Sequence, residues 1–277
     1  MIDRPIFIVG PHRSGTTLLY RILAQHPDIG YFNRFNKRLP AWPRLAKLLS
    51  LFSGKDVPME SQSIWDRFKK SDTDIMDETD AKPEVRDWYR NLISTVLQLR
   101  RAKRFLAKYP RLSLRLPWLN AIFPDAFFIH MKRDWRAVVN STVQRKKKRN
   151  KRNGGWFGVY IPGWQELDRM ISYEESATKI FVTVTRELEC LKERFGHRFV
   201  EVSYENLCHD PIITLHELTK RIELSWSEAF KLTIPKKLKN ANYKWQKQLD
   251  LQVLDRLRKN DPVFFKRYEF SETRHCK

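Results

Sequence analysis

The chain has 277 residues, of which 42% are hydrophobic and 13% aromatic, and this composition supports one large α/β domain or one domain with a helical insertion. The 53 lysines and arginines outnumber the 32 aspartates and glutamates, so the formal net charge is +21. Such a charge favours a polyanionic partner (nucleic acid, anionic lipid or acidic glycan) or simply a solvated basic surface, and charge alone does not choose among them. No stretch approaches the ~20 apolar residues that a membrane span needs.

We expect a cytoplasmic location, with peripheral contact at the inner face of the membrane as the alternative. The first strand is predicted almost at the start of the chain, so we expect no signal peptide. The three cysteines are scattered and odd in number, which fits reduced thiols better than a disulfide framework, and none has the spacing of a metal ligand.

A strand, a tight loop and a helix are predicted at residues 6–24. Four apolar residues at 6–9 are typical of a buried strand, Gly10 and Pro11 end it, and residues 16–24 have helical periodicity. A helix that begins directly after such a loop points unpaired backbone N–H groups and its positive dipole end at an anion. Arg13 adds a cation, and three further side chains add hydroxyl donors: Ser14, Thr16 and Thr17. The alternative is an ordinary turn that binds nothing.

This loop differs from that of nucleoside triphosphatases. Gly10 and Gly15 have the spacing of GxxxxGK[ST], but Thr16 occupies the lysine position, and the cation lies inside the loop at Arg13. Without the Lys-Ser/Thr pair that holds the terminal phosphates and Mg²⁺, the loop suits phosphate chemistry that needs no metal, so a kinase or nucleotidase is the less favoured reading.

Further along the chain, the pattern predicts helices and two more strands. The strands are expected at 126–131 and 199–202. The acidic stretch 71–78 is expected to be a solvated turn or a helix cap. Helices are expected at the following ranges: a short one within 33–47, then 61–69, 85–105, 112–122, 135–145, 173–194, 211–221 and 249–259.

Two polar sites follow the later strands. Arg133 ends the strand at 126–131, and Ser141 lies eight residues on, in the following helix. Ligands of open α/β sheets bind at that edge, and an arginine with a hydroxyl opposite suits a phosphate. Tyr204 follows the strand at 199–202. The alternatives are that Arg133 forms a surface ion pair with Asp134, that Ser141 is a small helix residue packed on the sheet, and that Tyr204 is a core residue at a strand end.

The segment GPHRSGTTLL resembles the 5′-phosphosulfate loop of sulfotransferases that use 3′-phosphoadenosine 5′-phosphosulfate (PAPS), in the form found in bacterial and Golgi-type members. Matches to this family run from the first strand past residue 210 and include FPDAFFIHMKRDWRAVVNS and FVEVSYENL. The resemblance implies a P-loop-type three-layer sandwich with a central, mostly parallel sheet. It also implies PAPS as cosubstrate, held by Arg13, Ser14, Gly15, Thr16, Thr17 and Leu18 at the 5′ side, by Arg133 and Ser141 at the 3′-phosphate, and by Tyr204 near the adenine.

The resemblance further implies in-line attack on sulfur without metal, with 3′,5′-ADP as the second product. Arg13 and Lys108, the latter in a KxP segment, would stabilise the developing charge. Many relatives carry a glutamate just after the first helix, whereas residues 30–39 of this chain hold no carboxylate. Glu60, in PMESQSIWDRF, is therefore our leading candidate for the general base, and His12 is the second.

We predict one sulfotransferase domain over 1–277, with a helical acceptor-side segment at about 35–107 and an aromatic and basic loop at about 145–165. Basic runs at 34–47 and 145–152, with Trp42, Trp156 and Trp164 nearby, suit an anionic saccharide acceptor. A glycolipid at an anionic membrane surface would use the same features, and a solvated loop is the alternative for 145–152. The acceptor is a hydroxyl or an amine.

Two other functions fit parts of the sequence. The missing glutamate fits a protein that binds PAPS without transferring its sulfuryl group. The charge and RKKKRNKR fit a nucleic-acid or polyanion-binding protein, although no recognised reader motif is present, so no specific nucleic acid is expected.

Overall fold

The computed structural model describes residues 2–54, 56–150, 156–169 and 172–270. Its centre is a sheet of five parallel strands in the order β2-β3-β1-β4-β5. The strands are β1 (Ile6–Val9), β2 (Ile29–Gly30), β3 (Arg104–Lys108), β4 (Phe127–Lys132) and β5 (Phe199–Ser203). The sheet confirms the predicted α/β class with a mostly parallel sheet.

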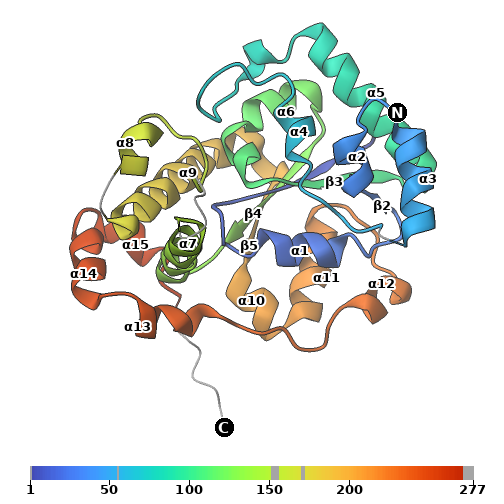
Figure 1. Cartoon of the computed structure of the whole chain (residues 1–277). Coiled ribbons are helices and arrows are strands. Elements are labelled where there is room, and N and C mark those ends of the chain that lie inside the picture. Colours follow the sequence, from blue (N-terminus) through green and yellow to red (C-terminus); the bar gives the residue numbers. More distant parts are fainter. Residues whose placement is uncertain (1, 55, 151–155, 170–171, 271–277) are drawn as a thin grey trace.

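Helices cover both faces of this sheet because successive strand residues point to opposite sides (Figure 1). Ile6 and Ile8 pack with α1 (Thr16–Leu23), α10 (Tyr204–His209), α11 (Pro211–Arg221) and α12 (Glu228–Thr233). Phe7 and Val9 pack with α4 (Gln62–Trp65), α5 (Pro83–Arg100), α6 (Leu116–Ile122) and α9 (Tyr173–Phe195). The result is the expected three-layer sandwich.

A third apolar cluster lies beside the sheet. It joins α7 (Trp135–Asn150) and α9 to the C-terminal helices α13 (Trp245–Gln248), α14 (Leu251–Lys259) and α15 (Pro262–Lys266). The remaining helices are α2 (Arg34–Arg38), α3 (Pro43–Ser53) and α8 (Trp164–Arg169). Within the described ranges, no helix has the length and apolar character needed to cross a bilayer.

The structure corrects the prediction for residues 85–105. The helix α5 ends at Arg100, and the chain then forms the strand β3 next to β1. Arg104, which we placed in the helix, is buried, and its guanidinium donates to the carbonyls of Arg4, Ile222 and Glu223. The single helix predicted at 112–122 is a 3₁₀ turn, Pro110–Leu114, followed by α6.

The strand order places the first loop at the centre of the molecule. β1 lies between β3 and β4, so the ends of these three strands meet at one edge of the sheet. In open α/β sheets ligands bind at the carboxyl edge, where the strand order reverses. Lys108 ends β3, Arg133 follows β4, and Tyr204 follows β5.

Candidate functional site

The loop between β1 and α1 has an unusual backbone. Gly10 has φ +138° and Gly15 has φ +99°, values that glycine adopts without a Cβ clash. Arg13 has φ +72°, which is strained for a residue with a side chain. No side chain caps the N-terminus of α1, and the Ser14 hydroxyl is buried without a hydrogen-bond partner. The loop therefore presents uncompensated donors, as expected of a site for an anion.

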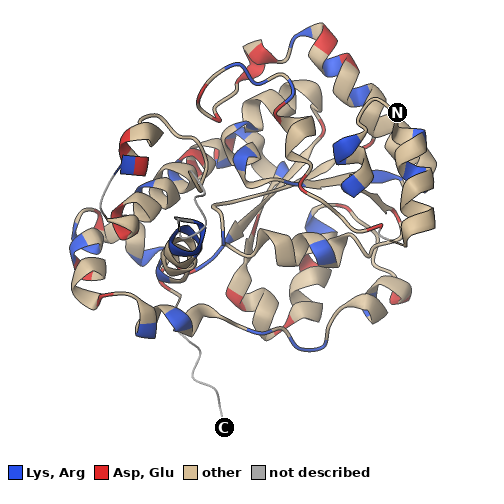
Figure 2. Cartoon of the chain, viewed as in Figure 1, with Lys and Arg blue, Asp and Glu red and all other residues tan. Residues whose placement is uncertain are grey.

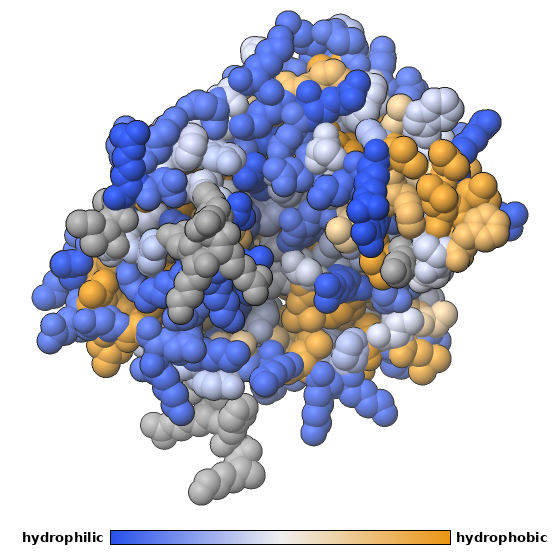
Figure 3. All heavy atoms as spheres, viewed as in Figure 1, coloured by the Kyte–Doolittle hydropathy of each residue, from blue (hydrophilic) through white to orange (hydrophobic). Residues whose placement is uncertain are grey.

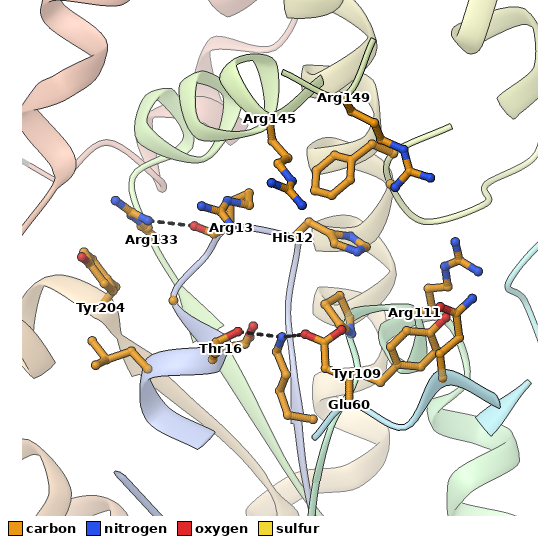
Figure 4. Close-up of a pocket in the computed structure, with 18 of the residues that line it drawn as sticks. His12, Arg13, Thr16, Glu60, Tyr109, Arg111, Arg133, Arg145, Arg149 and Tyr204 are labelled. Atoms are coloured by element: carbon orange, nitrogen blue, oxygen red, sulfur yellow. Dashed lines mark hydrogen bonds and ion pairs between the residues drawn. The ribbon is translucent and has the colours of Figure 1, made fainter. Parts of the chain in front are cut away.

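A cavity of about 920 Å³ opens at this loop (Figure 4). Most of the predicted site residues line it: His12, Arg13, Gly15, Thr16, Thr17, Leu18, Glu60, Lys108, Arg133 and Tyr204. Ser14 and Ser141 are not in its lining. Ser14 is a buried residue of the loop, and Ser141 accepts a hydrogen bond of 2.9 Å from Arg13 Nε. The structure thus brings together residues that lie far apart in the sequence.

Arg133 is built into one wall of the cavity. It is buried, and its Nη1 donates to the carbonyl of Arg13 at 2.8 Å, while its Nε donates to Asn242 Oδ1 at 2.8 Å. Asp134 is paired with Arg136 at 2.6 Å, so the alternative of a surface pair between Arg133 and Asp134 is wrong. Burial is the main cause that lowers the pKa of Arg133.

Tyr204 connects this wall to the loop. One part of its ring lies so close to Gly15 that a Cβ there would be 2.4 Å from Tyr204 Cδ2. The guanidinium carbon of Arg133 lies 4.1 Å from the ring centroid, and the Tyr204 hydroxyl donates to the Lys239 carbonyl at 3.3 Å. The ring is both packed and part of the cavity lining, so the two readings of Tyr204 are compatible.

Lys108 and Glu60 form an ion pair inside the cavity. The Lys108 side chain is only 3% exposed, and its Nζ also donates to Thr17 Oγ1 at 2.8 Å, whereas Glu60 is half exposed. Burial lowers the pKa of Lys108, against the opposing effect of Glu60. A buried cation and an accessible carboxylate therefore meet at the start of α1. Such a pair can supply a charge stabiliser and an acid or base.

His12 lies inside the loop, with its ring 5.5 Å from that of Phe157. Burial, reinforced by the cations of Lys108, Arg111 and Arg13, lowers the pKa of His12 to about 3. The imidazole is therefore neutral near pH 7. The Glu60 side chain is half exposed and lines the cavity, so of the two predicted candidates Glu60 is the more accessible to an acceptor.

The far end of the cavity holds three arginines. Arg145 projects from α7 toward Arg13 and His12, Arg149 lies on the side of His12 away from Arg13, and Arg111 lies beside Tyr109 (Figure 4). Neither Arg145 nor Arg149 makes an ion pair with a described carboxylate. Among the described lining residues, seven cations face a single carboxylate, that of Glu60: Arg13, Lys108, Arg111, Arg133, Arg145, Arg149 and Lys239. Figure 2 shows the basic positions gathered along the end of α7.

Arg111 was missed by the sequence analysis. It lies three residues after Lys108, in the 3₁₀ turn Pro110–Leu114 that follows β3, and this position just beyond a strand end is the one signal that could have marked it. Its guanidinium lies 4.3 Å from the ring centroid of Tyr160 and within ion-pair distance of Asp66 and Asp74. Arg111 therefore has a fixed position on the cavity wall.

The acidic stretch 71–78 agrees with the prediction only in part. Asp77 caps a 3₁₀ turn, in agreement with the prediction, but Asp74 is fully buried and pairs with the equally buried Arg115 at 2.9 Å. Asp74 also accepts from the backbone N–H of Tyr160 at 2.7 Å. This carboxylate joins the stretch to the aromatic segment that closes the cavity.

The predicted acceptor features lie in different places. Trp156 lines the cavity, but the cavity lining does not include Trp42, Trp164 or any residue of the basic run 34–47. Trp42 is 66% exposed and precedes α3. Of the second basic run, residues 151 and 152 lie outside the described residues, as does 153–155 of the aromatic loop.

The chain matches the profile of the sulfotransferase family over residues 5–228. It is 29% identical over 261 residues to the omega-hydroxy-beta-dihydromenaquinone-9 sulfotransferase of Mycobacterium bovis, covering 82% of this chain and 65% of that protein. It is 28% identical over 232 residues to protein-tyrosine sulfotransferase 1 of Danio rerio, covering 82% of this chain and 55% of the relative. The chain thus spans about half to two thirds of these relatives' length.

Solved structures show the same fold. A sulfotransferase from Mycobacterium avium has a TM-score of 0.64 at 15% identity, covering 98% of this chain and 78% of that one. A sulfotransferase from Mycobacterium tuberculosis has a TM-score of 0.63 at 17% identity, covering 93% of this chain and 76% of that one.

Proposed function

Because this chain belongs to the sulfotransferase family, we propose that it transfers a sulfuryl group from PAPS to a hydroxyl of an anionic acceptor and releases 3′,5′-ADP. The observation that carries the proposal is the meeting of Lys108 and Glu60 against Thr17, at the N-terminus of α1 and inside a strongly cationic cavity. An anion cradle, a buried cation and an accessible carboxylate are the parts that this reaction needs.

The donor fits the cationic half of the cavity. The uncapped N-terminus of α1 and Arg13 would hold the 5′-phosphosulfate. Arg133 and Ser141 both contact Arg13, through its carbonyl and its side chain respectively, so a 3′-phosphate between them would lie next to the loop. The Tyr204 ring would lie near the adenine. When bound, PAPS supplies an activated sulfuryl group.

Glu60 would accept the proton of the acceptor hydroxyl. As the proton leaves, the acceptor oxygen forms a bond to sulfur, and the bond between sulfur and the phosphate oxygen breaks. Lys108 and Arg13 would stabilise the negative charge that builds on the oxygens around sulfur. Neutral His12 would not take the proton, since burial and the neighbouring cations lower its pKa to about 3.

The acceptor end favours an anion on or beside a ring. Arg111, Arg145 and Arg149 would bind a carboxylate, sulfate or phosphate, and the rings of Tyr160 and Phe157 would contact a flat or cyclic group. An anionic saccharide or glycolipid stays our prediction. The names of the relatives add two acceptor classes worth testing, an omega-hydroxylated menaquinone derivative and protein tyrosine.

The test is transfer of labelled sulfate from PAPS to a panel of anionic glycans, glycolipids, omega-hydroxylated menaquinones and tyrosine peptides, read as labelled product and 3′,5′-ADP. Glu60→Gln should lower kcat by roughly 10²–10⁴-fold. Its affinity for 3′,5′-ADP should be unchanged, because Glu60 lies on the acceptor side. Gln62→Ala, at a neighbouring position of the same lining, is the control and should retain most of the turnover.

Normal turnover by Glu60→Gln with intact binding of 3′,5′-ADP would eliminate Glu60 as the base. If PAPS binds but neither the wild type nor this variant transfers label to any acceptor of the panel, the protein is a PAPS-binding pseudoenzyme. Equal affinity for ATP and PAPS would instead favour the kinase alternative.

A further inference from the structure

The helix α3 is exposed on its apolar side. Its buried residues are small, Ala46 and Ser50, whereas its large apolar residues face outward. Helices on the surface of soluble proteins normally show the opposite arrangement, with an apolar stripe toward the core. The outward set, which we call the α3 patch, consists of Trp42, Leu45, Leu48, Leu49, Leu51, Phe52 and Val57. Figure 3 shows these hydrophobic side chains gathered over α3 at the right of the view.

The fold holds α3 firmly in this orientation. A proline begins the helix and Gly54, with φ +61°, ends it. On the inner side Lys47 pairs with Asp56, which also binds Arg100 of α5. With an ion pair and two small residues on the inner side, the leucines of the helix lie on its outer side. Phe52 is 83% exposed and Leu51 62%, so the α3 patch offers a large apolar surface.

The surroundings of the α3 patch are basic. Exposed cations flank it on α2 and at the start of α3: Arg34, Lys37, Arg38 and Arg44. No aspartate or glutamate occurs between Asp28 and Asp56. Apolar side chains rimmed by cations match the two components of an anionic bilayer surface, acyl chains and phosphate headgroups.

We propose that the α3 patch docks this protein on the surface of an anionic lipid bilayer. In this arrangement α3 lies in the plane of the interface, with its leucines and Phe52 among the upper acyl chains and the flanking cations at the headgroups. Trp42, at the N-terminal end, lies at the level of the headgroups, where tryptophan side chains are enriched. A second copy of this chain is a poorer occupant, because a two-fold interface centred on the patch would bring the same four cations together.

The docked surface would lie next to the acceptor side of the cavity. Met59 N–H donates to the Phe32 carbonyl at 2.9 Å, and Ser63 Oγ donates to the Lys37 carbonyl at 2.9 Å. These bonds tie α2, which packs on α3, to the segment that carries Glu60. A bilayer at α3 would therefore be close to the wall where the acceptor hydroxyl must be positioned.

The test is sedimentation of the full chain with vesicles of phosphatidylcholine alone or with about one third phosphatidylglycerol. We expect binding to the anionic vesicles and much weaker binding to the neutral ones. Leu48→Asp/Phe52→Asp should lower the partition coefficient at least tenfold. Arg38→Gln/Arg44→Gln should lower it by roughly fivefold per residue at low salt.

Matched controls exist on the opposite side of the molecule, where Figure 1 places α14 and α15. Leu251 and Val263 are exposed apolar residues of these helices, and Leu251→Asp/Val263→Asp should bind vesicles as the wild type does. Lys259→Gln/Lys266→Gln is the corresponding control for charge. All these positions are exposed, so the variants should fold, which circular dichroism checks.

Tryptophan quenching gives a second readout. Vesicles with brominated acyl chains should quench part of the fluorescence of the wild type, and Trp42→Phe should lose that part. The proposal is overturned if the wild type ignores anionic vesicles or if the patch and control variants bind alike. It is also overturned if sedimentation velocity without lipid shows a dimer that the patch variant alone dissociates. Sulfuryl transfer is measured separately, so failure here leaves the proposed reaction standing.

Discussion

Replacing Gly15 by alanine tests whether the loop and Tyr204 form one binding unit. A Cβ at Gly15 would lie 2.4 Å from Tyr204 Cδ2, about one ångström closer than ordinary van der Waals contact. The ring has little room to retreat, because Arg133 covers it at 4.1 Å and its hydroxyl is bonded to the Lys239 carbonyl. The backbone adds to the strain, since φ is +99° at this position.

The two effects set the expected magnitude. A side chain in the left-handed region costs roughly 1–2 kcal/mol, and forcing an extra methyl into a packed contact costs roughly 1–3 kcal/mol. The variant relieves this strain by moving the loop or the ring away from the binding geometry, and the ligand must restore that geometry when it binds. A penalty of about 2 kcal/mol corresponds to a roughly 30-fold weaker affinity for 3′,5′-ADP.

Calorimetric titration with 3′,5′-ADP measures this change. Gly54→Ala is the matched control: its φ is +61°, but a Cβ there meets nothing within 4 Å, so it should lower stability without changing affinity. Tyr204→Ala removes the ring, and adding Gly15→Ala to it should then cost much less than in the wild type. A folded Gly15→Ala variant that binds 3′,5′-ADP as tightly as the wild type would refute the reasoning.

Three other changes test the charged groups. Lys108→Met should lower kcat by roughly 10²–10³-fold in the transfer assay, because it removes a group that stabilises the developing charge. Its affinity for 3′,5′-ADP should change little. Normal turnover would contradict the role of Lys108 as a charge stabiliser. Burial lowers the pKa of His130 to about 4, so the neutral imidazole contributes its full share to the free energy of unfolding above pH ~6.5, and this share is lost as the pH falls toward 4. His130→Phe should reduce the loss by about 3 kcal/mol in urea titrations. An unchanged dependence of the free energy of unfolding on pH would show that His130 does not cause the loss. Asp74→Asn should lower the free energy of unfolding by about 3 kcal/mol, because it leaves Arg115 buried without its full counter-charge. Asp77→Asn, at an exposed helix cap, should lower it by at most about 1 kcal/mol in the same urea titrations.

The local structure around the loop and the later strand ends was predicted correctly from the sequence. The strand-loop-helix at 6–24 and the strand ends at Arg133 and Tyr204 follow from apolar runs and glycines that act within a few residues, and the structure has them where they were expected. The parallel sheet then brings these strand ends together without any further information from the sequence. Their roles toward PAPS stay predictions until binding is measured.

The strand β3 shows where such reasoning fails. Its sequence RFLAK has no β-branched residue and directly follows a cluster of arginines, so it looks like the end of the preceding helix. Burial against β1 and the capture of the Arg104 guanidinium by three carbonyls override that preference. Asp74 was misread for the same reason, since its partner Arg115 is 41 residues away.

The reacting centre depends on this kind of contact. Lys108 and Glu60 are 48 residues apart, and the helix predicted for 85–105 gave no reason for Lys108 to lie at the edge of the sheet. The pairing of β3 with β1 places Lys108 next to Thr17. The packing of α4 on the face of the sheet that holds Phe7 and Val9 brings Glu60 next to Lys108. The candidate anion-binding loop can be recognised from ten consecutive residues, whereas the two residues proposed to act on the acceptor come together only once the sheet has formed. For this reason variants of Lys108 and Glu60, more than those of the loop, decide whether the proposed chemistry is right.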